Sequence, residues 1–385
     1  MIPDPRIYCE IASALRPAIT LERWNVMPLA CLLPWAMIEI VMTTCYAYHA
    51  IEQQHTLTGH PEHRGRLAGV MGLLAGDGIL ERLLETAVTP VGPERLGRVH
   101  PQRYSEQVAR LAQAGGGHLD PDTYVVRGSY DAALASAGAL VNVVEAVMTG
   151  QAANGMSLMR PPGHHALPGR GMGFCIFANV AIAARTAQVE FGAERVLIVD
   201  WDVHHGNGTE AVFYEDPAVA FFSTHQSPFY PGTGAAADVG RGAGAGATLN
   251  VPLPAGIGDQ GYERAFAELL LPFAQRFRPD LILVSAGYDA HWRDPLASEL
   301  LSLTGYAALT RQVMALAQEL CAGRLVIALE GGYDLEVLAY AVLNTLRLLE
   351  QPDAAISDPF GPAAITERPV DQLVAGLRTL HYLPG

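Results

Sequence analysis

The chain contains no lysine, and all 25 of its basic residues are arginine. This absence excludes three kinds of catalytic site: a lysine Schiff base, a Walker phosphate site and a Ser-Lys dyad. The sequence also lacks a G-x-S-x-G nucleophile elbow. Its one glycine-rich run, residues 240–247, precedes a predicted strand, whereas a dinucleotide fingerprint must open a helix. Serine hydrolases of the elbow type, P-loop enzymes and dinucleotide-binding enzymes are therefore disfavoured.

Cysteine is scarce, and no two cysteines form a C-x-x-C pair. The five cysteines are widely scattered, at Cys9, Cys31, Cys45, Cys175 and Cys321. Such spacing indicates neither a disulfide framework nor a cysteine-based zinc site. We therefore expect a reduced, cytoplasmic protein.

Positive charge is also in short supply. The formal net charge is −14, with only 17% of residues charged. Because affinity for nucleic acid comes largely from basic side chains that neutralise phosphates, we expect no direct binding to nucleic acid. The negative electrostatic potential of this protein would instead favour a cationic small molecule or a basic peptide segment as a ligand.

Long apolar runs are few, and the run at Val26–Met42 is the one that resembles a targeting or membrane element. It is interrupted by two prolines, carries Glu39, and falls short of the roughly 18 to 20 apolar residues of a spanning helix. It also lacks a clearly basic leader. We expect no membrane span, and we interpret residues 1–41 as an N-terminal extension outside the core, with Met42 a candidate start. Residues 42–385 then form a single catalytic domain.

What the chain does contain is an alternation of short apolar runs and amphipathic stretches. This alternation is typical of an α/β fold with a mostly parallel central sheet and helices on both faces. Strands are predicted within residues 43–50, 156–160, 195–200, 219–223, 248–253, 281–287 and 324–332. Helices are predicted at residues 129–148, 179–191, 262–277 and 304–320.

Polar residues crowd the end of the predicted strand at 195–200. In an extended segment, side chains two residues apart point the same way, so Asp200, Asp202 and His204 should share one side. Asp289 follows another apolar strand, and ligands of parallel sheets bind beyond the carboxyl ends of the strands. Two carboxylates and an imidazole leave coordination positions free for water and a substrate oxygen. We predict a catalytic zinc site, although iron or manganese would also suit these ligands.

Two further strand ends carry groups suited to acid–base chemistry. The histidine pair His164 and His165 follows the strand at 156–160, and neutral imidazoles can accept a proton from water and return it to a leaving amine. Tyr333 follows two glycines after the strand at 324–332. A phenol at that position can donate a hydrogen bond to an oxyanion.

Taken together, the segments RPPGHHA, GFC, IVDWDVHHGNGT, YPGTG, SAGYDAHWRDPL and EGGYD resemble the histone deacetylase family in order and spacing. The likeness runs from about residue 44 to about residue 350. It is strongest to the bacterial and class II-like branch, which includes acetoin-utilisation and acetylpolyamine amidohydrolase relatives. The resemblance implies an arginase/deacetylase-type fold and a zinc-dependent amidohydrolase that removes acyl groups from the ε-amine of lysine in proteins or peptides.

The resemblance also implies a role for each residue that matches a family motif. Asp202, His204 and Asp289 would hold the metal, His165 would be the main proton shuttle beside His164, and Tyr333 would be the electrophilic tyrosine. Asp200 would orient His164, and Asn207 would orient His165. A monovalent cation, expected to be potassium, would be held by Asp200, Asp202, the main-chain oxygen of His204, Ser223 and Thr224.

A narrow slot for a flexible acyl-lysine stem would be built from Gly173, Phe174 and Tyr230. Asp122 falls where relatives hold the substrate backbone. Leu296 occupies the position at which polyamine-selective relatives place an acidic residue, which favours acyl-lysine.

Three alternatives remain open at this point. The chain could be an acetylpolyamine amidohydrolase if the loops at residues 51–66 and 92–121 supply the missing carboxylate. A ureohydrolase on the same fold would need a second metal and an aspartate where this chain has Gly206. A degenerate member could bind acyl groups without catalysis, although the intact Tyr333 argues against it. The sequence leaves homo-oligomerisation undecided.

Overall fold

The structure, a computed structural model, describes residues 43–384. The predicted extension at residues 1–41 lies outside the described residues, so both the extension and the domain boundary at Met42 stay predictions. The fold of residues 43–384 is built around one central sheet.

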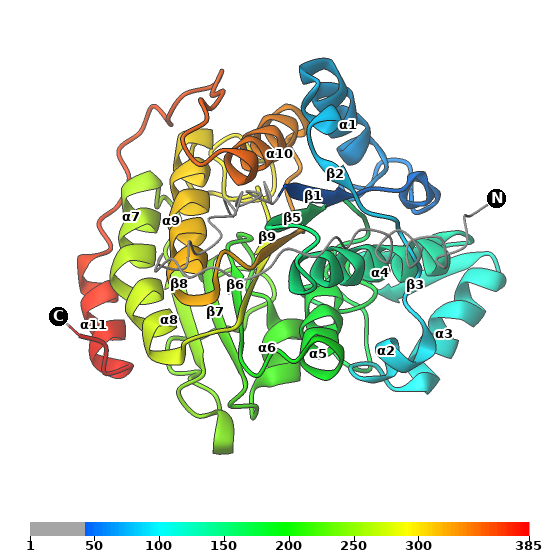
Figure 1. Ribbon diagram of the computed structural model, residues 1–385, viewed down its shortest axis with the longest axis horizontal. Coiled ribbons are helices and arrows are strands. Elements are labelled where there is room, and N and C mark those ends of the chain that lie inside the picture. Colours follow the sequence, from blue (N-terminus) through cyan, green and yellow to red (C-terminus); the bar gives the residue numbers. More distant parts are fainter. Residues whose placement is uncertain (1–42, 385) are drawn as a thin grey trace, which may run out of the picture. The chain divides into compact units, whose positions relative to one another are not determined.

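This sheet has eight strands in the order β2-β1-β5-β10-β9-β6-β7-β8, and every neighbouring pair is parallel (Figure 1). Its strands are β1 (Thr44–Ala47), β2 (Leu84–Glu85), β5 (Asn154–Ser157), β6 (Val196–Asp200), β7 (Val219–Gln226), β8 (Thr248–Leu253), β9 (Leu281–Ala286) and β10 (Leu325–Leu329). A strand is present at each of the seven predicted places, although β5 begins two residues before the predicted range and ends three residues before its end. The parallel arrangement gathers their carboxyl ends on one edge of the sheet.

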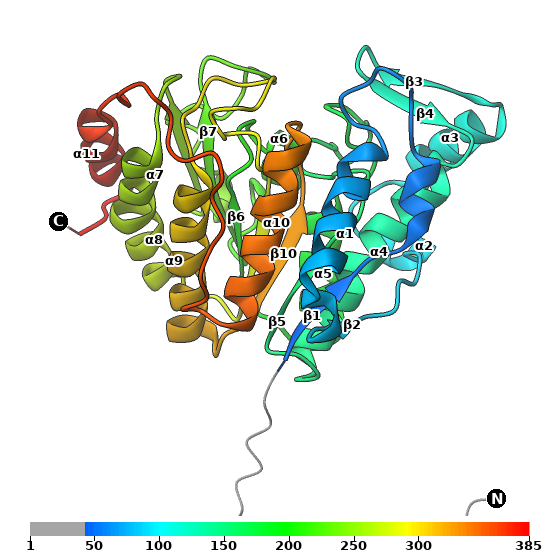
Figure 2. The same ribbon diagram turned by 90° about the horizontal axis from the view of Figure 1, so that it is seen from above.

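Helices cover both faces of the sheet, and the strands contribute alternate residues to two apolar layers. Leu197 and Val199 of β6 belong to one layer, whereas Val196 and Ile198 belong to the other. The first layer packs beneath α1 (Gly65–Asp77), α7 (Asp259–Ala265), α8 (Leu271–Phe277), α9 (Leu303–Cys321), α10 (Leu335–Glu350) and α11 (Asp371–Leu380). The second packs beneath α2 (Pro93–Gly97), α3 (Gln102–Gln113), α4 (Ser129–Met148), α5 (Asn179–Phe191) and α6 (Asn207–Phe213). Figure 2 shows α1, α9 and α10 side by side across the first face. The predicted α/β fold is confirmed.

The helix predictions hold with one correction. The predicted helices at residues 129–148 and 179–191 coincide with α4 and α5. Residues 262–277, predicted as one helix, instead form most of α7, a π-helical turn at Phe266–Leu270, and α8. Pro272 accounts for part of this change, because a proline has no N–H to donate within a continuous α-helix.

One helix among the described residues, α4, is long and apolar enough to cross a membrane. However, 72% of its apolar window is buried inside the fold. Its buried side chains include Ala133, Leu140 and Val144, which belong to the second apolar layer. Within this fold α4 therefore serves as a core helix.

A small hairpin, β3 (Gly116–Asp120) and β4 (Thr123–Val126), stands apart from the main sheet. The sequence patterns did not predict it, because β3 is rich in glycine and only partly buried. Its turn carries Asp122 toward the carboxyl edge of the main sheet, where Asp122 lines a cavity.

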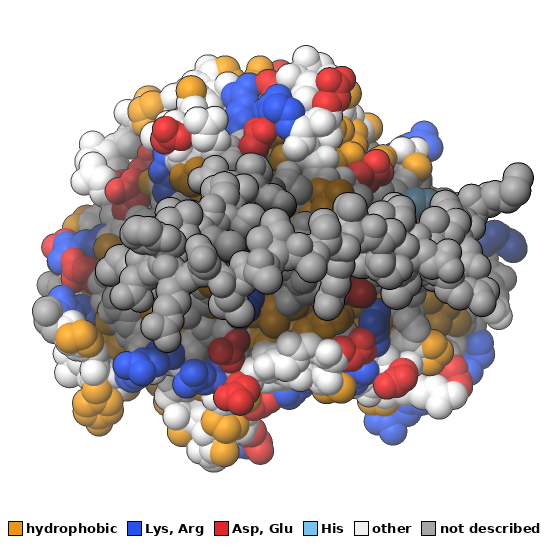
Figure 3. All heavy atoms as spheres, viewed as in Figure 1, with side chains coloured by type: hydrophobic (Ala, Val, Ile, Leu, Met, Phe, Trp, Pro, Cys, Tyr) orange, Lys and Arg blue, Asp and Glu red, His pale blue; other side chains and the backbone are white. Residues whose placement is uncertain are grey.

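On the face drawn in Figure 3, arginine and carboxylate side chains are interspersed. Among the described residues, several such side chains are paired across elements, as in the ion pairs Arg82–Glu350 and Arg264–Asp371. Exposed pairs of this kind contribute little to stability, with a typical range of about 0 to 1 kcal/mol each.

Candidate active site

The chain turns sharply after β6, and this turn brings its polar side chains together. The Asp202 N–H donates to Asp200 Oδ1 at 3.1 Å, and the His204 N–H donates to Asp202 Oδ1 at 2.9 Å. The side chains of Asp200 and Asp202 both lie near His164, and His204 lies near Asp202, but an extended strand is not the cause. β6 ends at Asp200, and side-chain bonds to the main chain bend the following residues, in the manner of Asx turns.

Asp202, His204 and Asp289 form a tight cluster whose ligand atoms all lie within 4.8 Å of one another. His204 Nδ1 lies 3.0 Å from Asp202 Oδ1 and 3.3 Å from Asp289 Oδ2. Asp289 Oδ1 accepts the Val203 N–H at 2.9 Å, while the buried Oδ2 has no hydrogen-bond partner among the described residues. A buried carboxylate oxygen without a donor is the feature expected of a metal ligand.

Charge in this cluster also fits a cation. Burial by itself lowers the pKa of His204, but the hydrogen bond to Asp202 and the nearby carboxylate of Asp289 outweigh it and raise the pKa to about 10. The two carboxylates thus hold a proton on the imidazole, at the place where a divalent ion would neutralise them better. The residues present fit a metal with mixed carboxylate and imidazole ligands.

The two histidines of the pair differ in their partners. His164 Nδ1 lies 3.0 Å from Asp200 Oδ2, and His165 Nδ1 lies 2.8 Å from Asn207 Oδ1. Burial lowers the pKa of His164, but the charges of Asp202 and Asp200 outweigh it and raise the pKa well above the usual value. Burial, together with the nearby His164 and His204, holds the pKa of His165 well below its usual value. His165 is therefore the neutral imidazole that can accept a proton.

These groups open onto a narrow cavity of about 210 Å³. It is smaller than the roughly 300 to 1,000 Å³ of pockets that take drug-sized ligands, so a slender chain fits it better. Eleven residues line it, and two of them, Pro162 and Gly331, were not predicted to belong to the site. The other nine are predicted catalytic, metal or substrate-binding residues: Asp122, His164, His165, Gly173, Phe174, His204, Tyr230, Leu296 and Tyr333.

Aromatic rings wall the cavity. Phe174 meets Tyr333 edge to face, with ring centroids 5.8 Å apart, and Tyr230 stands perpendicular to His165 at 5.2 Å. Gly173 has a positive φ of 55°, and a Cβ there would overlap the ring of His165. The slot predicted from Gly173, Phe174 and Tyr230 is thus assembled around the histidine pair.

Asp122 and Leu296 both line this cavity, as the slot prediction requires. His60, which the sequence patterns did not single out, supports Asp122. Its Nδ1 accepts the Glu62 N–H at 3.0 Å, so its Nε2 carries the proton and donates to the Asp122 carbonyl at 3.0 Å.

The polyamine alternative requires a free carboxylate from the loop at residues 51–66 or from the loop at residues 92–121. Both carboxylates of residues 51–66, Glu52 and Glu62, are fully buried and paired with Arg160. That loop therefore offers no free carboxylate to a substrate. In residues 92–121, Asp120 accepts the N–H groups of Asp122 and Thr123 at 3.2 and 2.7 Å.

Two residues behind Tyr333 were also missed. The Arg66 guanidinium lies 4.9 Å from the centroid of the Tyr333 ring and donates to the Gly332 carbonyl at 2.8 Å. The Asp294 carboxylate accepts the Tyr333 N–H at 2.7 Å. Asp294 stands in the motif SAGYDAHWRDPL and could have been noticed, whereas nothing in the sequence linked Arg66 to a tyrosine 267 positions away.

The residues predicted to bind a monovalent cation are also neighbours. The register of β6 and β7 pairs Asp200 with Ser223. Ser223 Oγ lies 2.9 Å from His225 Nδ1, and Thr224 Oγ1 is buried with no hydrogen-bond partner among the described residues.

Comparison with known proteins identifies the family. The model of the histone deacetylase domain matches residues 60–349, which is most of the chain. The chain belongs to the histone deacetylase family. It is 41% identical to histone deacetylase 14, chloroplastic, of Arabidopsis thaliana over 353 residues, which cover 86% of this chain and 82% of the relative. It is 42% identical to the histone deacetylase-like amidohydrolase of Pseudomonas aeruginosa over 308 residues, 80% of this chain and 81% of that protein.

A relative named polyamine deacetylase HDAC10, from Homo sapiens, is 40% identical over 316 residues, 78% of this chain and 46% of that protein. Among solved structures, that of the HDA15 HD domain matches with a TM-score of 0.81 and 34% identity, covering 89% of this chain and 94% of that one. The resemblance to the family and the arginase/deacetylase-type fold are confirmed. The protein is an amidohydrolase of the histone deacetylase family, a hydrolase acting on amide bonds.

Proposed function

We propose that the protein is a zinc-dependent deacylase that removes acetyl or related acyl groups from the ε-amine of lysine in proteins or peptides. The observation that carries the proposal is the narrow cavity with Phe174 and Tyr230 on its walls. At that cavity His165 and Tyr333 lie beside the cluster of possible metal ligands to which His204 belongs.

Zinc, held by Asp202, His204 and Asp289, would supply Lewis acidity to the amide carbonyl and to water. Iron or manganese would suit the same ligands. We also propose a potassium ion at Asp200, Asp202, Ser223, Thr224 and the main-chain oxygen of His204. The register of β6 and β7 and the unpaired Thr224 hydroxyl support that site.

Proton transfer in this proposal belongs to His165. Its Nδ1–H donates to Asn207 Oδ1 at 2.8 Å, which leaves Nε2 free to accept the proton of the attacking water. The same Nε2 then gives that proton to the departing lysine amine. Water and the amide are thereby converted into a carboxylate and a free amine. The neighbouring His164 is bonded through Nδ1 to Asp200, which fixes the orientation of its ring beside His165.

Tyr333 would hold the oxygen of the scissile carbonyl. Burial raises the pKa of its phenol well above the ordinary value, so the hydroxyl stays protonated and able to donate. A donor aimed at the developing oxyanion lowers the barrier more than it stabilises the substrate. The Arg66 guanidinium beside the ring and the Asp294 carboxylate on the main chain support Tyr333 in place.

The alternative substrate is an acetylated polyamine, as the name of the HDAC10 relative suggests. Leu296 at the cavity favours acyl-lysine, because an apolar side chain cannot pair with a distant ammonium group. Asp122 is the one acidic side chain on the cavity lining that could do so. Rates on an acetyl-lysine peptide and on acetylspermidine, measured side by side with the zinc-loaded protein, test the proposal. A kcat/KM at least tenfold higher on acetylspermidine would contradict it.

A ureohydrolase and a non-catalytic binder of acyl groups are both weaker candidates. A Cβ at Gly206 would overlap Asp200 Oδ2, so the aspartate that a two-metal ureohydrolase needs has no room there. A non-catalytic binder would have no use for Tyr333 and His165 at the same cavity. We further propose a cytoplasmic enzyme that does not bind nucleic acid directly, on the basis of its scattered cysteines and acidic charge.

A further inference from the structure

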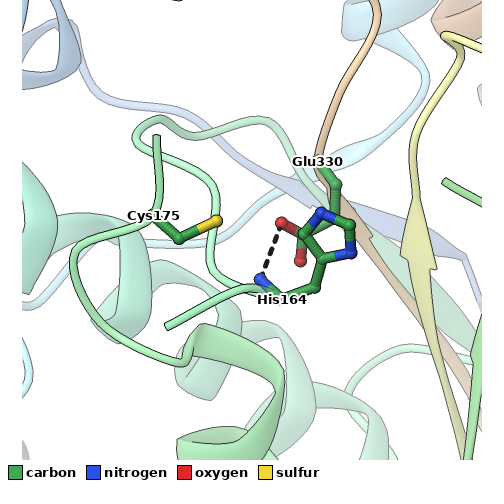
Figure 4. Close-up of side chains that lie close together, drawn as sticks. All are labelled: His164, Cys175 and Glu330. Carbon is green, nitrogen blue, oxygen red and sulfur yellow. Dashed lines mark hydrogen bonds between the residues drawn. The ribbon is translucent and has the colours of Figure 1, made fainter. Parts of the chain in front are cut away.

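The loop that carries the histidine pair pairs with no strand of the sheet; it is held by side chains and by the N–H groups of Gly208 and Thr209, which donate to the His164 carbonyl at 2.9 and 3.2 Å. The N–H groups of Gly163 and His164 both donate to Glu330 Oε2, at 2.7 and 3.2 Å. The next N–H, that of His165, donates to Cys175 Sγ at 3.4 Å. Figure 4 shows His164, Cys175 and Glu330 close together, with the bond from the main-chain nitrogen of His164 to Glu330.

Glu330 is itself fixed on the other side of the site. It follows β10 directly, is 1% exposed, and accepts the Ser285 hydroxyl of β9 through Oε1 at 3.2 Å. The following residue, Gly331, donates its N–H to Asp202 Oδ2 at 2.8 Å. Tyr333 stands three residues after Glu330. The end of β10 thus touches the histidine loop, a predicted metal ligand and the predicted oxyanion donor.

His164, Cys175 and Glu330 have ligand atoms within 4.8 Å of one another, and such a group could hold a second metal. Their polar atoms, however, already have partners. His164 Nδ1 binds Asp200, Glu330 Oε2 accepts two N–H groups, and the sulfur accepts a third. Burial also raises the pKa of the Cys175 thiol well above its usual value, so it remains a thiol. The cluster is therefore better understood as a clamp on the main chain than as a metal site.

We propose that Glu330 is a positioning residue that holds the main chain of Gly163 and His164, and thereby places the His165 imidazole at the correct distance from the predicted metal ligands and Tyr333. This inference rests on the proposed function, because it assigns a role within the same reaction. A catalytic group displaced by about 1 Å can lower the rate by roughly 10²-fold. Loss of the clamp should therefore lower kcat with little change in KM.

Two substitutions can distinguish the hydrogen bonds that Glu330 accepts from its negative charge. Both N–H groups of the loop bind one oxygen, so the Oε1 of a glutamine can replace that oxygen. The amide nitrogen would then donate to Ser285 Oγ, whose hydroxyl can rotate. Glu330→Gln keeps the clamp without the charge, whereas Glu330→Ala removes both.

A matched control exists elsewhere in the chain. The Glu367 carboxylate accepts the N–H groups of Gly258, Gln260 and Gly261 at 2.7, 3.1 and 3.2 Å, at the start of α7. Glu367→Ala therefore removes a clamp of the same chemistry that touches none of the cavity residues.

The experiment combines kinetics with amide hydrogen exchange followed by mass spectrometry on the wild-type protein and the three variants. We expect Glu330→Ala to lower kcat by roughly 10²-fold, with KM within threefold, and to speed exchange in the peptide around residues 161–166. Glu330→Gln should keep kcat within fivefold and keep that peptide protected. Glu367→Ala should speed exchange near residues 257–262 and leave kcat unchanged.

Several outcomes would overturn the inference. Unchanged exchange at residues 161–166 in Glu330→Ala would show that Glu330 does not hold the loop. Faster exchange with normal kcat would show that the clamp does not serve catalysis, and an equal loss in Glu330→Gln would show that charge matters rather than position. An inactive wild-type protein on every acyl substrate would reject the proposed function alone, since the exchange data would still decide whether the clamp exists.

Discussion

At the scale of single residues, the rate of the proposed reaction should depend strongly on the Tyr333 hydroxyl. Its hydroxyl would donate to an oxygen whose negative charge grows only as the reaction proceeds. Tyr333→Phe should therefore lower kcat by roughly 10² to 10³, the usual effect of removing one oxyanion donor. Because Tyr333 is not among the predicted metal ligands, metal content measured by elemental analysis should stay at the wild-type level. A near-normal rate would remove Tyr333 from the chemistry.

Asp289 is predicted to bind the metal rather than the substrate, because its Oδ2 is the buried carboxylate oxygen in the metal cluster that accepts no hydrogen bond. Asp289→Ala should abolish both metal binding and activity. Asp371→Ala is the matched control, since that aspartate is exposed and pairs with Arg264. Zinc stoichiometry after dialysis distinguishes the two variants. Full occupancy in Asp289→Ala would contradict its assignment as a ligand.

At the scale of elements, the site depends on how closely the strand ends approach. The main chain of Gly331, just after β10, lies against the two carboxylates of the metal cluster. A Cβ there would lie 2.5 Å from Asp202 Oδ2 and would also overlap Asp289 Oδ2. Both carboxylates are fully buried and accept main-chain N–H groups, so moving away from that Cβ would break these hydrogen bonds.

Gly331→Ala should therefore weaken metal binding at least tenfold and lower activity with it. Gly72→Ala is the control, because a Cβ in that position of α1 meets no atom within 4 Å. Removing a mid-helix glycine should also stabilise the control by roughly 0.5 to 1 kcal/mol. Zinc affinity measured by competition with a chelator would reveal the difference. Equal affinities would mean that the strand ends are not packed as described.

These elements also show what the sequence could predict. Most strands and several helices could be predicted from the sequence, because apolar runs of the right period and length specify buried strands and amphipathic helices. The polar residues at the carboxyl ends of β5, β6, β9 and β10 could also be predicted once these strands were recognised. Parallel strands bring their carboxyl ends to one edge, so polar residues following them must meet.

The residues that escaped prediction act over long sequence distances or through unusual burial. Arg66 reaches the Gly332 carbonyl across 266 positions, and Glu330 reaches back 167 positions to Gly163. A glutamate after a strand ordinarily faces solvent, and only tertiary packing makes this one a buried acceptor. The β3–β4 hairpin was missed because its glycines give no apolar alternation. The site was thus predictable in its reacting groups but not in the groups that hold them.

At the scale of the whole molecule, folding buries titratable groups that do not serve the site, and these link stability to pH. His100 is one: its Nδ1–H donates to the Pro168 carbonyl and its Nε2 accepts the Ala178 N–H, both at 2.9 Å. Burial lowers the pKa of His100 to about 4. The unfolded chain therefore takes up the proton first, near pH 6.5, and stability is lost as the pH falls from there through 4.

His100→Gln keeps a donor and an acceptor but cannot be protonated in this range. The fall in thermal midpoint between pH 7 and pH 4 should therefore be smaller in this variant than in the wild-type protein. Differential scanning calorimetry at half-unit pH steps measures it. Parallel curves for the two proteins would mean that His100 is not the neutral, buried group described above.

Glu299 also links stability to pH, but in the opposite direction: its contribution is lost as the pH rises. Its Oε2 accepts the Ile257 N–H at 2.7 Å, and its Oε1 is buried with no partner among the described residues. Burial raises the pKa of Glu299 to about 8, whereas an unfolded glutamate titrates near 4.3. The folded state thus keeps the proton longer, so the stability that this group contributes is present below about pH 4.3 and is lost as the pH rises through 8. Glu299→Gln cannot ionise, so the thermal midpoint of this variant should rise relative to that of the wild-type protein from pH 5 to about pH 8 and level off above it. A constant gap over that range would show that Glu299 reaches solvent and ionises normally.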